Sequence, residues 1–291
     1  MASQPGHSLS LFSRRPQELV EIAPGRAVSL PYAMFPEGEY DAIVNFVGSG
    51  DPARIAGMGG SILEITYEFD SLALGYLRRH PGTRYIFLSS GAAYGQTFDE
   101  PAGRDTPAGY PINDLKPGDF YAIAKLHAEC RHRALPDARI IDIRIFNYFS
   151  RTADIAARFL MTDIVRAIRR NEVLQVGVTP MSRDFLTPPD FAHLIDCALD
   201  APPANLVLDA YSRAPVEKFA LLERMSDEFG LRYDIVPAPP IVQATGAKPQ
   251  YYSTNHRAAE LGYEPAHSSI DGVVTEARAL FQHLDSKNEP P

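Results

Sequence analysis

Residues 85–95 read Tyr-Ile-Phe-Leu-Ser-Ser-Gly-Ala-Ala-Tyr-Gly, and the rest of the chain can be interpreted outward from this stretch. Its first four residues are apolar and favour β structure without polar alternation, which is typical of a strand buried on both faces of a parallel sheet. The run ends at two hydroxyl residues, Ser89 and Ser90. Because ligands bind outside the carboxyl ends of the strands in an open α/β sheet, the sequence predicts that Ser90 faces a ligand.

Tyr121 and Lys125 stand four residues apart in a helix-compatible run, so both side chains fall on one face of the helix. A free tyrosine has a pKa near 10 and is protonated at neutral pH. A lysine ammonium beside it would favour the phenolate and make Tyr121 a usable proton acceptor or donor. We therefore predict that Ser90, Tyr121 and Lys125 form a catalytic set. The alternative is that Tyr121 and Lys125 are an ordinary amphipathic pair on a helix surface.

The composition of the chain limits the classes of protein to which it can belong. With 291 residues, 45% of them hydrophobic and 22% charged, it can form one large core or a main domain with a smaller one. A net charge of −8 argues against a nucleic-acid surface, and no apolar run reaches membrane-spanning length. The N-terminus lacks a signal-peptide core, and two cysteines supply no disulfide framework. We expect a cytoplasmic protein that binds neither nucleic acid nor a membrane.

Apolar runs alternate with amphipathic segments through the first half of the chain. Strands are predicted at residues 8–12, 27–30, 41–47, 85–88 and 139–146, and helices at 17–22, 62–76 and 121–134. Strands that alternate with helices in this way predict an α/β fold with a Rossmann-like doubly wound parallel sheet.

The pattern changes after residue 147. Helices are predicted at residues 155–168, 189–199, 215–229 and 270–284, short strands at 173–176 and 206–208, and an irregular proline-rich segment at 230–254. We expect residues 1–150 to form a Rossmann-like dinucleotide-binding domain and residues 151–291 to form mainly a smaller C-terminal substrate domain. Segments near 185–212 are expected to return to the first domain.

The chain resembles the extended short-chain dehydrogenase/reductase family, in its nucleotide-sugar epimerase/dehydratase branch. Five motifs carry the resemblance in family order: Leu88-Ser-Ser-Gly-Ala-Ala-Tyr-Gly95, Tyr121-x-x-x-Lys125, Arg144-Ile-Phe-Asn147, Ser182-Arg-Asp-Phe185 and residues 253–265, which end in Glu-Leu-Gly-Tyr-Glu-Pro. A lone Tyr-x-x-x-Lys is a weak signal, but five motifs in order are a specific one.

The resemblance implies a nucleotide-diphosphate sugar as substrate and NAD or NADP as cofactor. Tyr121 would be the acid/base, Ser90 would orient the substrate hydroxyl or carbonyl, and Lys125 would also contact the cofactor. Asn147 and Arg183 would hold the diphosphate, since an arginine fork suits phosphate oxygens. Alternatively, Arg183 could pair with a nearby carboxylate, either Asp184 or Asp190.

The reaction type is narrowed by the residues that follow Ser90. Dehydratases that resemble this branch carry an acidic pair directly after the strand-end hydroxyl, whereas this chain has Gly91 and Ala92, which cannot transfer protons. Elimination is therefore disfavoured, and epimerisation or ketone/alcohol interconversion is expected. The alternative function is that of a pseudoenzyme or partner subunit that has no cofactor but retains the sugar-nucleotide pocket.

The start of the chain departs from the family pattern. Family members begin with a strand and a glycine-rich turn that cradles the dinucleotide pyrophosphate at a helix N-terminus. Here no G-x-x-G-x-x-G is found near the start, and residues 6–16 resemble the family's second strand, so that a unit of roughly 30 residues is missing. We expect weak NAD(P) binding and an uncovered or rearranged sheet edge between residues 8–12 and 41–47. Self-association into a homo-oligomer through that edge would follow. A further alternative is that Met1 is internal to a longer natural protein.

Arg14 and Arg15 follow the presumed second strand, where an acidic residue would bind the ribose hydroxyls of NAD. Arginine at this place suits a 2′-phosphate, which favours NADP over NAD as the better of two weak ligands. The alternative is a solvated pair of arginines in a loop.

His127, Cys130 and His132 could be considered as metal ligands. Their spacing spreads them around a helix axis, and no second pair of ligands is near in the sequence. We therefore expect no metal site and assign the three residues to a solvated helix face.

Overall fold

A four-stranded parallel sheet forms the centre of the molecule. The computed structural model describes residues 7–19, 27–48, 51–95, 97–237 and 248–286. The strand order is β10-β5-β4-β3, with β3 at Ala42–Asn45, β4 at Arg84–Ser90, β5 at Ile140–Ile145 and β10 at Asn205–Asp209. The predicted α/β class with a Rossmann-like parallel sheet is confirmed.

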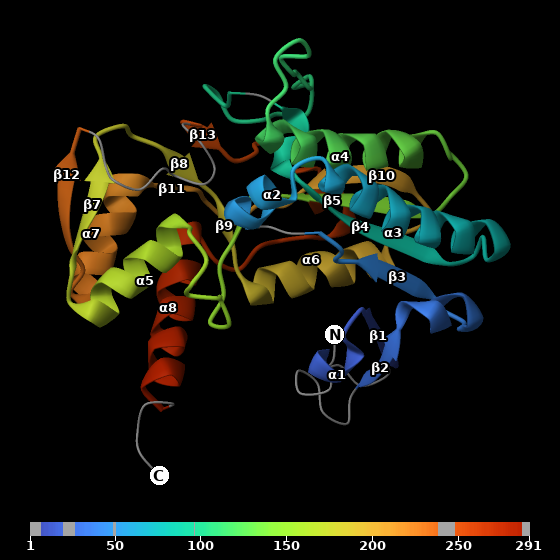
Figure 1. The fold of residues 1–291 in the computed structure, drawn as a ribbon, viewed down its shortest axis with the longest axis horizontal. Helices are drawn as coiled ribbons and strands as arrows, with labels where there is room; N and C mark the ends of the chain where they lie inside the picture. Colours follow the sequence, from blue (N-terminus) through green and yellow to red (C-terminus); the bar gives the residue numbers. More distant parts are fainter. Residues whose placement is uncertain (1–6, 20–26, 49–50, 96, 238–247, 287–291) are drawn as a thin grey trace.

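Helices cover both faces of this sheet (Figure 1). On one face lie α3 (Ser61–Arg79) and α4 (Pro117–Arg133), and on the other lies α6 (Pro188–Asp200). Successive residues of β4 point to opposite faces, so Tyr85 and Phe87 pack in the cluster under α3 and α4, whereas Ile86 packs in the cluster under α6. Burial on both faces explains why residues 85–88 of β4 are continuously apolar.

A second, two-stranded parallel sheet stands apart from the first. It pairs β1 (Leu9–Ser13) with β2 (Ala27–Pro31), and in the described part of the chain neither strand pairs with β3. The expected break between residues 8–12 and 41–47 is therefore confirmed. No residue of β1 or β2 is fully buried, whereas six of the seven residues of β4 are.

The small sheet is joined to the rest by the 3-10 helix η1 (Tyr32–Glu37), which follows β2, and by aromatic contacts. The short helix α1 (Pro16–Leu19) lies between β1 and β2 in the sequence. The ring of Phe12 lies 5.3 Å from that of Phe35 and 5.8 Å from that of Tyr40, measured between ring centroids. Tyr40 in turn lies 5.3 Å from Tyr76 on α3. Side-chain packing, rather than a hydrogen-bonded ladder, thus connects the two sheets.

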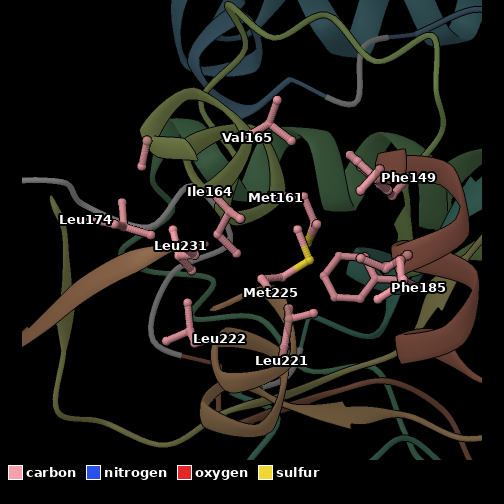
Figure 2. Close-up of a cluster of buried hydrophobic side chains, with 14 of the residues drawn as sticks. Phe149, Met161, Ile164, Val165, Leu174, Phe185, Leu221, Leu222, Met225 and Leu231 are labelled. Carbon is pink, nitrogen blue, oxygen red and sulfur yellow. The ribbon is translucent and has the colours of Figure 1, made fainter. Parts of the chain in front are cut away.

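The second half of the chain has its own hydrophobic cluster (Figure 2). Three helices contribute to it, α5 (Leu160–Arg170), α7 (Lys218–Phe229) and α8 (Ser269–Ser286), together with the parallel pair β7 (Val173–Gly177) and β12 (Arg232–Val236). Met161 and Met225 meet in the middle of this cluster. The strand β12 was predicted as irregular. Its residues Tyr233, Ile235 and Val236 favour β structure, and the partner strand that orders them is far away in the sequence.

Short elements complete the described chain: α2 (Pro52–Met58), η2 (Gly91–Tyr94), β6 (Asn147–Tyr148), β8 (Ser182–Arg183), β9 (Phe185–Leu186), β11 (Val216–Glu217), β13 (Gln250–Tyr251) and η3 (Arg257–Leu261). Of these, β8 pairs with β11 and β13, and β6 pairs with β9. Among the described helices, none combines the length and the apolar character that crossing a bilayer requires.

The expectation of a solvated face on α4 is wrong for His132. Its side chain is completely buried, with Nδ1 2.6 Å from a carboxylate oxygen of Asp142 and Nε2 2.7 Å from one of Asp70. Burial disfavours the charged imidazole, but the hydrogen bonds to Asp142 and Asp70 outweigh it and raise the pKa of His132 to about 9. His127 and Cys130 are exposed, and the described residues contain no group of three potential metal ligands.

Candidate active site

Ser90 is the last residue of β4 and is only 7% exposed. Its Oγ accepts a hydrogen bond from the backbone N–H of Ala92 at 3.1 Å, which caps the 3-10 helix η2. The chain can turn here because position 91 is a glycine: a Cβ on Gly91 would overlap the ring of Phe146. The tight turn fixes the Ser90 hydroxyl at the carboxyl end of the sheet.

Tyr121 and Lys125 reach the same place from α4. This helix begins with proline in its first turn, and the Asp119 carboxylate accepts a hydrogen bond from the backbone N–H of Lys116 at 2.8 Å. Tyr121 lies near enough to the Ser90 side chain for their interaction to lower the Tyr121 pKa, against the larger effect of burial. Lys125 Nζ donates to the backbone carbonyl of Leu88 at 2.7 Å and lies 5.8 Å from the centre of the Tyr121 ring. The structure thus brings Ser90, Tyr121 and Lys125 together.

Burial dominates the ionisation of this set. Lys125 is 4% exposed, and burial lowers its pKa to about 8. Burial also raises the pKa of Tyr121, against the smaller opposing effect of its interaction with Ser90. The sequence led us to expect a lowered Tyr121 pKa. The difference arises because burial of Tyr121 disfavours the charged phenolate, while the Lys125 ammonium donates its hydrogen bond to the backbone of β4.

A second tyrosine, which the sequence analysis did not single out, completes the cluster. Tyr251 of β13 is 4% exposed; burial raises its pKa, and the interaction with the nearby Ser90 side chain opposes this rise. Its ring packs edge-on against Phe98 and Phe146, with centroids 4.8 and 5.2 Å apart. The one signal in the sequence was its position just before the motif at residues 253–265.

A buried arginine and a partly buried lysine lie beside the Tyr251 ring. Arg183 Nη1 donates to the backbone carbonyls of Ser182 and Lys248, both at 2.8 Å, and its guanidinium lies 5.8 Å from the ring centre. Lys248 Nζ, which we did not predict, lies 4.7 Å from the same ring. Burial lowers the pKa of Arg183 to about 10 and that of Lys248 to about 8.

Asn147 is directed at backbone groups in the same region. Its side-chain amide donates to the carbonyl of Asp184 at 3.1 Å and to that of Tyr251 at 3.4 Å. The Asp184 carboxylate accepts hydrogen bonds from Ser212, and the Asp190 carboxylate accepts them from the backbone of Ala266. Both carboxylates that were considered as partners of Arg183 are therefore engaged with other groups.

The paired arginines lie elsewhere. Arg14 and Arg15 are exposed, and Arg14 borders an open cavity of about 580 Å³. The cavity is also lined by residues of η1 and α3: Tyr32, Ala33, Glu68, Phe69, Ser71 and Leu72. Ser90, Tyr121 and Lys125 do not line this cavity.

The described residues fit the ends of a dinucleotide better than its middle. Lys125 Nζ lies close to Gly48, just past β3: a Cβ placed on this glycine would be 3.6 Å from the ammonium nitrogen. Because the glycine has no side chain, the ammonium there faces the backbone. Arg14 supplies a cation at the separate cavity. The described residues contain no G-x-x-G-x-x-G turn, which in dinucleotide-binding folds presents backbone donors to the pyrophosphate.

Solved structures with this fold include several nucleotide-sugar enzymes. UDP-glucose 4-epimerase from Thermotoga maritima, solved with UDP-glucose, is 16% identical with a TM-score of 0.79, over 96% of this chain and 92% of that chain. UDP-glucose-4-epimerase from Stenotrophomonas maltophila, with bound NAD and formylated UDP-arabinopyranose, is 18% identical with a TM-score of 0.74, over 96% and 93%. RMD from Pseudomonas aeruginosa, complexed with NADPH, is 18% identical with a TM-score of 0.68, over 94% and 99%.

At sequence identities of 16–18%, the likeness to these solved structures establishes the fold alone. No curated protein matches the chain significantly. The sequence itself matches the NAD dependent epimerase/dehydratase family over residues 29–212, which is more than half of the chain and includes the Ser90, Tyr121, Lys125 and Arg183 positions. The chain therefore belongs to the NAD-dependent epimerase/dehydratase family, within the extended short-chain dehydrogenases/reductases.

Proposed function

We propose that this chain is an NAD(P)-dependent epimerase or reductase that acts on a nucleotide-diphosphate sugar. The observation that carries the proposal is the convergence of Tyr121, Lys125 and Ser90 at the carboxyl end of β4. Family membership and the nucleotide-sugar enzymes with the same fold support the substrate class.

In this proposal Tyr121 moves the proton. Ser90 orients a sugar oxygen by hydrogen bonding, and the Tyr121 phenol exchanges a proton with that oxygen. The Lys125 ammonium, 5.8 Å from the Tyr121 ring centre, provides the positive charge that favours phenolate at the moment of transfer. A bound nicotinamide would supply hydride exchange at the sugar carbon.

The diphosphate is assigned to the two cations beside Tyr251. Arg183 and Lys248 both have pKa values lowered by burial, because their charged forms have lost hydration. A diphosphate would restore favourable interactions to both, and Asn147 lies close enough to add an amide contact. Residues 151–291 would then supply most of the substrate site, and residues 1–150 the catalytic set. Loss of a charged hydrogen bond in Arg183→Ala should weaken UDP binding by about 1.5–3 kcal/mol.

The cofactor is expected to bind weakly. Lys125 would contact the ribose of the cofactor. Arg14 and the neighbouring Arg15 would contact its adenosine end, where a 2′-phosphate makes NADP(H) the better ligand.

The break between β1 and β3 lies where the pyrophosphate turn of the fold belongs, which favours a second candidate function. That candidate is a pseudoenzyme or partner subunit that binds the sugar nucleotide without a cofactor. Binding of UDP-glucose with no response to NAD(H) or NADP(H) would favour it.

Replacement of Tyr121 by phenylalanine tests the proposed mechanism. Tyr121→Phe keeps the shape of the ring but cannot transfer a proton, so kcat should fall by about a hundredfold or more while UDP-glucose still binds. Tyr67→Phe, at a half-exposed tyrosine on α3, is the matched control and should behave as wild type. Turnover and calorimetric binding are measured on the same preparations. Near-normal turnover in Tyr121→Phe would remove this residue from the mechanism.

A further inference from the structure

Residues 248–255, which we name the returning segment, run alongside the loop 98–102. Three backbone hydrogen bonds of 2.7 to 3.0 Å join the two, from Gln250 to Phe98, from Ala102 to Tyr252 and from Thr254 to Ala102. These bonds hold the segment and the loop to each other but not to the parallel sheet. The attachment to the sheet is made by a side chain.

That side chain is the carboxylate of Asp209, the last residue of β10, which is fully buried. Its Oδ2 accepts a hydrogen bond from Ser253 Oγ at 2.6 Å and a longer one from the Asn255 side-chain amide at 3.4 Å. The same oxygen accepts a hydrogen bond at 2.8 Å from the phenol of Tyr94 on η2. One carboxylate thus joins the end of the sheet, the returning segment and the turn that follows β4.

Arg144 of β5 extends this connection to the helix that carries the catalytic set. Its Nη1 lies 3.6 Å from Asp209 Oδ1, and its Nε and Nη2 donate to the Glu129 carboxylate at 2.5 to 3.1 Å. Glu129 lies one turn after Lys125 on α4. None of the three charged side chains is more than 15% exposed, so displacing one of them would leave a buried charge unpaired. The paired charges therefore fix Asp209 relative to α4.

We propose that Asp209 is a positioning residue for recognition of the diphosphate: through Ser253 it fixes the returning segment, and with it Lys248, at the end of the sheet that carries the catalytic set. Arg183 is included in this placement, because its Nη1 donates to the backbone carbonyl of Lys248. Asp209 acts through the returning segment rather than by contact with the substrate. The inference rests on the proposed function, which assigns Arg183 and Lys248 to the diphosphate.

The energetic reason is preorganisation. A segment that is already held in place before the ligand arrives loses little conformational freedom on binding, whereas a loose segment has to be ordered at the expense of affinity. The catalytic set lies on β4 and α4, outside the returning segment. Loosening the segment should therefore weaken binding and leave the chemical step unchanged.

Ser253→Ala removes the shortest hydrogen bond to the Asp209 carboxylate and leaves every charge in place. UDP should bind this variant about tenfold more weakly, the lower end of the range for a hydrogen bond to a charged group, because the backbone bonds to the loop remain. The KM for UDP-glucose should rise by a similar factor while kcat stays that of wild type. Unchanged UDP binding, or a fall in kcat without a rise in KM, would overturn the proposal.

Ser268→Ala is the matched control. It removes a hydrogen bond of the same kind, 2.7 Å from the hydroxyl to the Asp271 carboxylate, at an exposed position just before α8. UDP should bind this variant as it binds wild type. A similar loss of affinity in Ser268→Ala would overturn the assignment of the effect to the returning segment.

A double-mutant cycle tests whether Ser253 acts through Asp209. In an Asp209→Asn background the acceptor of the hydrogen bond is neutral, so Ser253→Ala should cost less UDP affinity there than it does in wild type. An equal loss in the two backgrounds would overturn the role of Asp209.

Hydrogen exchange without ligand separates this proposal from the proposed function. In Ser253→Ala the amides of Gln250 and Thr254 should exchange faster than in wild type, whereas the amides of α8 should exchange at the same rate. Equal rates at Gln250 and Thr254 in the two proteins would overturn the attachment, whatever the affinity for UDP. If these amides exchange faster but wild type does not bind UDP, the proposed function fails, and the role of Asp209 in recognition of the diphosphate fails with it.

Discussion

Lys125 shows how far burial sets the properties of a single residue. Three nearby carboxylates raise its pKa, one at position i+4 on α4 and two on neighbouring elements. Burial outweighs them and leaves a pKa of about 8. At pH 7 the ammonium is mostly protonated, and it loses its proton as the pH passes about 8. If the charge of Lys125 supports the Tyr121 phenolate, activity has to follow this titration.

We therefore expect kcat/KM to fall on the alkaline side with a midpoint near pH 8. Lys125→Arg keeps its charge through this range, so the alkaline fall should move to higher pH in that variant, both in kcat/KM and in kcat at saturating substrate. Lys248→Arg tests the second lysine of similar pKa, which is assigned to the diphosphate, and it should change the profile of kcat/KM but leave the midpoint of kcat in place. A pH profile of Lys125→Arg with the midpoint of wild type would assign the titration to another group.

Single residues also show what the sequence could and could not predict. Ser90, Tyr121 and Lys125 were predictable because a strand end and a four-residue spacing place them by local geometry alone. Tyr251 and Lys248 were not, because the chain returns to the site about 130 residues after Tyr121, through a segment without periodicity. Such a return is decided by tertiary packing, which the local pattern does not encode.

At the scale of elements, α4 is packed on two sides rather than one. One side carries Tyr121 and Lys125 to the site, and another inserts His132 between Asp70 of α3 and Asp142 of β5. Arg131 and Arg133 also pair with these carboxylates, at 2.6 and 2.9 Å. The network ties helix to helix and helix to sheet. Periodicity revealed the helix, but it could not show that a polar stripe is enclosed by a second element.

The raised pKa of His132 predicts a pH-dependent contribution to stability. The imidazolium form stabilises the fold fully below its unfolded pKa of 6.5, and this stability is lost as the pH rises through about 9. The free energy of unfolding of wild type should therefore exceed that of His132→Gln, and this difference should shrink by about 3 kcal/mol between pH 6 and pH 9.5.

Urea unfolding of both proteins at several pH values measures this difference. His127→Gln, at an exposed position of the same helix, is the matched control for replacing a histidine of α4 by glutamine. A constant difference for His132→Gln would mean that His132 is neutral in the fold.

For the whole molecule, the decisive feature is the interrupted sheet. The element pattern predicted both the doubly wound class and the place of the break, because each strand between residues 8 and 146 has a clear apolar run. The break leaves an apolar side chain in contact with solvent beside it: Phe46, just past β3, is 61% exposed. Exposed apolar groups next to an unpaired strand edge promote contact with another chain.

We expect wild type to associate with itself as its concentration rises, as measured by sedimentation velocity. Phe46→Asp puts a charge beside the edge of β3 and should shift the equilibrium toward monomer. Ile112→Asp is the matched control, at a position 78% exposed in the loop before α4, and should associate as wild type does. A wild type that stays monomeric at high concentration would show that the edge is protected.

The interruption also determines how the molecule opens. The pair β1–β2 is joined to the rest through the rings of Phe12, Phe35 and Tyr40 and not through a continuous ladder, so it can detach while β4 and β5 stay paired. In native-state hydrogen–deuterium exchange, amides of β1–β2 should exchange through a sub-global opening, and those of β4–β5 only through global unfolding. The chain then consists of two cooperative units of unequal stability, and the weaker one carries Arg14.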